Sequence, residues 1–146
     1  MWIIKPFNEL TTNELFGILY LRTRIFVVAQ KRIYQEVDLN DPKAIHVFKM
    51  VDGKVIAYAR IFKEADHVTF GRVVTAPEYR GQGYGKDLLD QVMTTIKTNF
   101  AGMPIEIEAQ TQVQKLYTKF GFINHGQPFI FESTPHIQMI HEPLAG

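Results

Sequence analysis

The stretch that most constrains this chain lies between residues 68 and 89, where an apolar run leads into a glycine-containing loop. Gly81, Gly83 and Gly85 punctuate the loop, and a helical pattern follows at once. Glycine permits positive φ angles and lets a ligand approach the main chain closely. Converging N–H groups and the positive end of a helix dipole favour an anion at such a turn. The stretch therefore predicts a strand, a phosphate-binding loop and a helix in direct succession.

Composition excludes several classes of protein. A chain of 146 residues with 46% hydrophobic and 21% charged residues is typical of one globular domain, here residues 1–146. A net charge of +1 argues against general nucleic-acid binding. The absence of cysteine excludes disulfides, a thiolate nucleophile and thiolate metal sites. No apolar run is long enough to span a membrane, and no signal peptide is evident, so we expect a cytoplasmic protein.

Before the glycine loop, the sequence predicts a strand, a helix and three further strands. Thr11 and Glu14 have the spacing of a capping box, which satisfies N–H groups at a helix start. An Asp-Gly pair at residues 52–53 indicates a hairpin turn, and Gly71 inside the last strand indicates a bulge or a close ligand. The predicted elements are a strand at residues 2–4, a helix over 15–26 and strands at 46–50, 55–62 and 68–75.

After the loop, apolar spacing predicts a helix over residues 88–96. Residues 105–110 then alternate between apolar and polar side chains, so one face of this strand should look into water or into a cleft. A second helix over residues 111–120 ends at Gly121, and two strands follow at 123–132 and 136–141. The order is β-α-β-β-β-α-β-α-β-β, an α/β fold with a mixed sheet.

The loop between residues 29 and 45 is irregular and rich in acids, which could receive a cationic amine. Arg22 interrupts the apolar stripe of the preceding helix. Either its stem packs while the guanidinium reaches water, or it is a buried arginine at the edge of the site cleft. For any single acid of the loop, a solvated surface position is the competing interpretation.

Two well-known phosphate-binding loops do not fit the glycine spacing. A P-loop requires Ser or Thr after its Gly-Lys, whereas Gly85-Lys86 is followed by Asp87. A dinucleotide-binding loop requires Gly-x-Gly-x-x-Gly near the start of the fold, whereas this loop opens only after residue 80. The remaining pattern is Arg80-x-x-Gly83-x-Gly85.

That pattern resembles the coenzyme A pyrophosphate loop of the GCN5-related N-acetyltransferase (GNAT) superfamily. The order of elements resembles that of the superfamily along nearly the whole chain, and residues 116–122 match its Leu-Tyr-x-x-x-Gly-Phe signature. Within the superfamily, residues 21–30, 34–38 and 135–139 resemble the ElaA-like group. The resemblance implies a GNAT-type fold and direct transfer of an acetyl group from acetyl-CoA, as cosubstrate, to a primary amine.

By this resemblance, the loop binds the pyrophosphate through main-chain N–H groups and the side chain of Arg80, and the preceding strand pairs with the pantetheine arm. The N–H of Val74 is the candidate oxyanion donor, worth about 2.7–4 kcal/mol in such sites. The predicted cofactor-binding residues are Val73, Val74, Thr75, Arg80, Gly81, Gln82, Gly83, Tyr84, Gly85 and Lys86.

Tyr117 in the signature is the candidate general acid for the coenzyme A thiolate, and its alternative is a core aromatic residue. An alkylammonium acceptor needs a base, for which Glu106 and Glu108 on the alternating strand are candidates. Glu36, His46 and His136 are their rivals. Predicted acceptor-binding residues are Arg22, Gln35, Glu36, His46 and His136. No metal is expected, because the histidines lack ligand spacing.

The identity of the acceptor is open at this level: a polyamine, amino sugar, drug, or protein N-terminus or lysine all fit. A homodimer is compatible with the sequence, which does not fix the oligomeric state. A non-catalytic module that binds coenzyme A with the same fold is the main alternative. A domain that binds nucleotides or nucleic acid is disfavoured by the loop spacing and the near-neutral charge.

Overall fold

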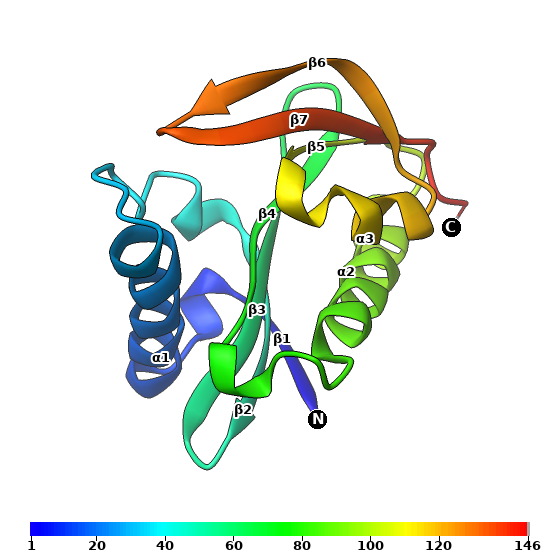
Figure 1. The fold of residues 1–146 in the computed structure, drawn as a ribbon. Helices are drawn as coiled ribbons and strands as arrows, with labels where there is room; N and C mark the ends of the chain where they lie inside the picture. Colours follow the sequence, from blue (N-terminus) through cyan, green and yellow to red (C-terminus); the bar gives the residue numbers. More distant parts are fainter. Residues whose placement is uncertain (146) are drawn as a thin grey trace.

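The computed structural model describes residues 1–145 and has the predicted order of strands and helices (Figure 1). No helix within these residues is both long enough and apolar enough to cross a lipid bilayer. The strands are β1 (Trp2–Pro6), β2 (Ile45–Val51), β3 (Lys54–Lys63), β4 (Val68–Thr75), β5 (Ile105–Gln110), β6 (Ile123–Phe131) and β7 (Thr134–His141). The helices are α1 (Thr12–Arg22), α2 (Tyr84–Asn99) and α3 (Gln114–Lys119).

The strands form one mixed sheet in the order β1-β2-β3-β4-β5-β7-β6. All neighbours are antiparallel except β4 and β5, which are parallel and pair only at Val68 and Ile105. Figure 1 shows the consequence: β1–β4 run along the length of the molecule, while β5, β7 and β6 cross its upper end. Strands β4 and β5 are therefore neighbours only at Val68 and Ile105, and they separate beyond this pair.

Helices cover both faces of the sheet, with α1 on one side and α2 and α3 on the other (Figure 1). The α1 side packs Ile18 and Leu21 on Phe48, Ile56 and Tyr58. The opposite core is the larger one, and it contains Leu88, Leu89, Val92, Ile96, Ile105, Ile107, Tyr117 and Phe122. The central strand β3 is buried from Val55 to Phe62, since both layers cover it.

The predicted capping box begins α1. The N–H of Glu14 donates to Thr11 Oγ1 at 3.1 Å, and the N–H of Thr11 donates to Glu14 Oε1 at 2.9 Å. The end of this helix differs from the prediction, because the chain continues from Thr23 to Ala29 as a π-helical segment. Apolar spacing does not distinguish the wider π turn from an α turn, so the two appeared as one helix over residues 15–26.

The helix predicted over residues 111–120 is also divided. Residues 111–113 form a 3₁₀ turn, and α3 itself begins only at Gln114. Gly121 follows with a φ of 92°, as expected for a residue that ends a helix. This short helix carries Tyr117, whose ring packs edge-on against Phe70 of β4 at 5.9 Å and against Phe122 at 6.1 Å between ring centroids.

Candidate functional site

A cleft of about 990 Å³ opens where β4 and β5 separate. Its walls come from β4, β5, the start of α2, α3, the loop of residues 30–44 and the β6–β7 hairpin. The volume lies within the range of small-molecule sites. The cleft forms because β4 and β5 separate after Val68 and Ile105. Beyond that pair, the main-chain groups of β4 on the side of β5 have no neighbouring strand to bond.

The glycine loop forms one end of the cleft, and it joins β4 to α2 in the strand–loop–helix succession that the sequence predicted. Gly81 and Gly83 have φ angles of 77° and 86°, which favour glycine, and α2 begins directly after them. The N–H of Asp87 donates to the carbonyl of Gly83 at 3.1 Å. The N–H groups of residues 84–86 precede this first helical bond and have no helical acceptor. They are available to an anion at the positive end of the helix dipole.

The side chains around the loop differ in their relation to the cleft. Arg80, Gly81, Gly83, Tyr84 and Gly85 line it, and Arg80 Nε donates to the carbonyl of Thr75 at 3.3 Å. The side chains of Gln82 and Lys86 do not line the cleft. Lys86 instead contacts Asp90 at 3.2 Å on the surface of α2, and Gln82 donates to the carbonyl of Glu78 at 3.4 Å. Any role of these two in anion binding rests on their main chain.

Strand β4 carries a bulge beside β3, where the pairing of Tyr58 with Val74 is followed by that of Arg60 with Gly71. Gly71 therefore stands next to an irregularity, as predicted, and Arg72 and Val73 together lie opposite the single residue Ala59. Arg72 has a φ of 53°, a strained conformation for a residue with a side chain. Such bulges redirect side chains and main-chain groups near functional sites.

The strand register argues against Val74 as the oxyanion donor. The N–H of Ala76 donates to the carbonyl of Ile56 at 2.7 Å, and Val74 pairs with Tyr58 two residues further along. Residues two apart in an antiparallel ladder direct their N–H groups to the same side. The N–H of Val74 thus faces β3, whereas the main chain of Thr75 faces the cleft, where Arg80 contacts its carbonyl.

Tyr117 lines the cleft from α3 and is only 5% exposed. Burial raises the pKa of its phenol, so the hydroxyl keeps its proton at neutral pH. The ring is part of the core, but the cleft reaches this residue. Both interpretations of Tyr117 from the sequence are therefore compatible with its position, and a protonated phenol is what a general acid requires.

Glu106 and Glu108 both line the cleft from β5, on the polar face that the alternating pattern predicted. Glu106 is half-buried and accepts a hydrogen bond from Gln138 Nε2 at 3.3 Å. Glu108 is exposed. His136 also lines the cleft, from β7, and its ring stacks on Phe129 at 5.9 Å between centroids.

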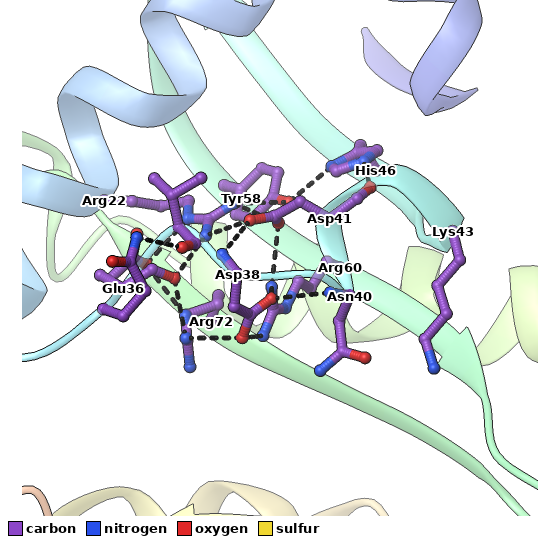
Figure 2. A network of polar contacts seen from close by, with 12 residues as sticks. Arg22, Glu36, Asp38, Asn40, Asp41, Lys43, His46, Tyr58, Arg60 and Arg72 are labelled. Carbon is purple, nitrogen blue, oxygen red and sulfur yellow. Dashed lines mark hydrogen bonds and ion pairs between the residues drawn. The ribbon is translucent and has the colours of Figure 1, made fainter.

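Four other candidates lie outside the cleft lining: Arg22, Gln35, Glu36 and His46. Arg22 is fully buried, so the interpretation that its guanidinium reaches water is wrong. It belongs to a polar network (Figure 2), donating from Nε to Glu36 at 2.8 Å and from Nη1 to Asp41 at 2.7 Å. Burial alone would lower the pKa of Arg22, but these carboxylates raise it. The arginine therefore fixes the 30–44 loop against α1.

His46 is buried in the same network. Its Nδ1 lies 2.6 Å from Tyr58 Oη and its Nε2 lies 3.0 Å from the carbonyl of Asp41. Burial lowers the pKa of the imidazole, so it is neutral at pH 7. With both nitrogens occupied by protein groups, His46 cannot meet an acceptor in the cleft without rearrangement.

Sequence reasoning missed a group of charged and aromatic residues that line the cleft. Arg60 and Arg72 interrupt the apolar runs of β3 and β4, and both line the cleft beside Asp38. Arg60 Nη1 donates to Asp38 at 2.6 Å and to Asp41 at 2.9 Å (Figure 2). Arginine within a central strand was the available signal. Arg32 and Tyr34 of the loop complete the group.

Comparisons with known proteins give a consistent result. Residues 17–143 match the family described as "Acetyltransferase (GNAT) domain". The chain is 38% identical over 141 residues to a UPF0039 protein of Schizosaccharomyces pombe, covering 94% of each chain. It is 32% identical to protein ElaA of Escherichia coli over 148 residues, covering 98% of this chain and 97% of ElaA.

Solved structures agree. The crystal structure of Escherichia coli ElaA matches this fold with a TM-score of 0.92, over 97% of this chain and 99% of ElaA. The crystal structure of an acyl-CoA N-acyltransferase from Pseudomonas aeruginosa, 34% identical, gives a TM-score of 0.91 over 97% and 98% of the two chains. The resemblance to the superfamily and its ElaA-like group is confirmed.

Proposed function

Because the chain belongs to the GNAT acetyltransferase family, we propose that it transfers an acetyl group from acetyl-CoA directly to a primary amine. The family and fold support an acyl-CoA-dependent acetyltransferase in general. The choice of acetyl as the acyl group, the amine acceptor and the residue roles below are the finer part of the proposal. Residues 1–146 would act as one catalytic domain.

The observation that carries this proposal is the alignment of three features along one cleft. The start of α2 offers unpaired N–H groups at one end, the separated main chain of β4 follows, and the carboxylates of β5 face it. This arrangement fits a long cosubstrate with a pyrophosphate and an amide-containing arm. Acetyl-CoA would supply an acetyl group activated as a thioester.

The chain's own residues would perform two proton transfers and one charge stabilisation. Glu106, directly or through water, accepts a proton from the ammonium so that nitrogen can bond to the acetyl carbon. As the carbon–sulfur bond breaks, the Tyr117 hydroxyl protonates the sulfur. The main-chain N–H of Thr75 replaces that of Val74 as a candidate oxyanion donor, because neighbouring residues in a strand direct their N–H groups to opposite sides. The N–H of Val73 is a second candidate, because the bulge redirects main-chain groups there.

Turnover assays test the function directly. The purified protein is incubated with acetyl-CoA and a panel of primary amines, and both free thiol and acetylated amine are measured. We expect amine-dependent release of coenzyme A. Acetyl-CoA binding without transfer to any amine would instead support the non-catalytic coenzyme A module. In a parallel thermal-shift screen, stabilisation by ATP but not by acetyl-CoA would refute the assignment of the cleft.

Tyr117→Phe tests the general acid. The variant keeps the buried ring and removes only the hydroxyl, so we expect kcat to fall by about a hundredfold or more, with the affinity for acetyl-CoA nearly unchanged. Tyr79→Phe, at another tyrosine that lines the cleft, is the matched control and should retain most activity. Unchanged turnover in Tyr117→Phe would remove this residue from the mechanism.

A further inference from the structure

Arg32 is a buried guanidinium without a carboxylate partner. It is 3% exposed and lines the cleft. Its Nε donates to the carbonyl of Glu132 at 3.0 Å and its Nη1 to Gln30 Oε1 at 3.2 Å. Within residues 1–145 it takes part in none of the ion pairs. A buried charge that meets only neutral groups is costly unless a ligand of opposite charge completes it.

Tyr34 connects this arginine to a second one. The centre of the Arg32 guanidinium lies 4.3 Å from the centroid of the Tyr34 ring, and that of Arg72 lies 5.6 Å from it. The Tyr34 hydroxyl oxygen is buried and has no hydrogen-bond partner within residues 1–145. An unpartnered buried hydroxyl needs an explanation, and an oxygen atom of a ligand in the cleft would accept a hydrogen bond from it.

Arg72 has remaining donor capacity toward the cleft. Its Nη2 donates to the carbonyl of Glu36 at 2.9 Å and to Asp38 at 3.3 Å (Figure 2). Among the described residues, Nη1 donates to no protein acceptor, whereas the buried Nε lies 2.9 Å from Glu36 Oε2 in an ion pair without hydrogen-bond alignment. Burial and the nearby charge of Arg60 lower the pKa of Arg72.

The formal charges beside the cleft show an excess of positive charge. In the network of Figure 2, the cations Arg22, Arg60 and Arg72 balance the anions Glu36, Asp38 and Asp41. Adding Arg32 leaves one unbalanced positive charge at this end of the cleft. The facing strand β5 contributes Glu106 and Glu108. The acceptor side is therefore bipolar, with arginines on one wall and carboxylates on the other.

We propose that the acceptor carries a carboxylate as well as its amine, and that Arg32 and Arg72, whose guanidinium groups both lie near the ring of Tyr34, bind this carboxylate. The amine then lies toward Glu106. A single excess positive charge matches a monoanionic carboxylate better than a dianionic phosphate monoester. This inference deepens the proposed function, on which it rests, by assigning amino carboxylates as the acceptor class.

Matched amine pairs test the inference. Tyrosine is compared with tyramine and lysine with cadaverine, since the members of each pair differ by the carboxylate; phosphoethanolamine and ethanolamine form a phosphate pair. In the wild type we expect kcat/KM for the amino carboxylate of at least one pair to exceed that of its decarboxylated partner by about tenfold or more, as charge-assisted hydrogen bonds allow. A larger ratio for the phosphate pair would overturn the assignment to carboxylates.

Variants link the preference to the arginines. Arg32→Gln and Arg72→Gln should each reduce the carboxylate ratio several-fold while leaving KM for acetyl-CoA unchanged. The carboxylate also changes the basicity of the amine, but this effect is the same in every variant, so it cancels when the ratio in a variant is compared with the ratio in the wild type. Lys97→Gln, which removes an exposed charge of α2 outside the cleft, should preserve the ratio. An unchanged ratio in both arginine variants would overturn the proposal.

Two measurements keep this test separate from folding and from the proposed function. Arg32→Lys retains the charge and serves where Arg32→Gln does not fold; we expect an intermediate ratio. Calorimetric titration of tyrosine and tyramine into the wild type with coenzyme A present reads the anion site without turnover. The same titration is made with lysine and cadaverine, and equal affinities within both pairs would overturn this inference, whereas absent acetylation of every amine would refute the proposed function alone.

Discussion

Asp41→Asn is expected to destabilise the fold by about 2.4 kcal/mol or more at pH 7, with a loss that shrinks in acid. Asp41 is 5% exposed and accepts hydrogen bonds from Arg22 at 2.7 and 3.1 Å and from Arg60 at 2.9 Å. Burial alone would raise the pKa of this carboxyl, but the two guanidinium groups lower it from 3.8 to about 2. Its charged form is therefore favoured in the folded state.

The magnitude and the pH window follow from this shift. Since one pKa unit corresponds to about 1.36 kcal/mol, the carboxylate contributes roughly 2.4 kcal/mol of stability above pH 5. A group whose folded pKa is depressed loses its contribution as the pH falls from the unfolded toward the folded value. At pH 3 about 1 kcal/mol should remain. Stranding Arg22 and Arg60 beside a neutral amide adds to the loss at pH 7.

Urea unfolding at pH 7 and pH 3 measures both effects. Asp90→Asn is the matched control, because Asp90 forms an exposed pair with Lys86 and should change the free energy of unfolding by only about 0.5 kcal/mol or less. A difference between wild type and Asp41→Asn below about 1 kcal/mol at pH 7 would refute the reasoning, since one pKa unit is already worth more. So would a difference that does not diminish at pH 3.

Three further predictions concern the helix starts and the base. Thr11→Ala should lower the free energy of unfolding by about 1 kcal/mol through loss of the capping box, whereas Thr12→Ala, whose side chain caps nothing, should change it less; equal effects would count against the cap. Gly83→Ala should weaken acetyl-CoA binding in calorimetry, because φ is 86° at the anion loop; Gly53→Ala, with a φ of 76° in the β2–β3 hairpin, carries a similar backbone cost without the binding loss. Glu106→Gln should reduce kcat/KM by at least about a hundredfold and more than Glu108→Gln, because Glu106 is the half-buried member; an equal or reversed order would assign the base elsewhere.

Much of the fold was predictable from short-range patterns. The capping box at Thr11, the hairpin at residues 52–53, the alternation of residues 105–110 and the glycine loop each depend on neighbours within a few positions. These features gave the order of elements and the position of the glycine loop before α2. The π-helical segment after α1 was missed because its wider turn leaves no mark in the apolar spacing.

The acceptor side could not be predicted in the same way. Arg22, Glu36 and His46 were chosen as acceptor ligands from residue type. In the structure they belong to one buried polar network, in which Arg22 bonds Glu36 and His46 bonds the carbonyl of Asp41, and none of the three lines the cleft. Their contacts join residues that are distant in the chain, and they depend on the path of the 30–44 loop. No local pattern records that path.

The sequence by itself determined the family, the order of strands and helices, and the glycine loop that leads into α2, because these rest on local motifs, backbone preferences and spacing. Only the tertiary structure decided which way the N–H of Val74 points and which charges reach the cleft. Strand register directs the N–H of Val74 toward Tyr58. Burial among opposite charges decides the rest, because the carboxylates of the network hold Arg22 away from the cleft, whereas Arg32 and Arg72 line it.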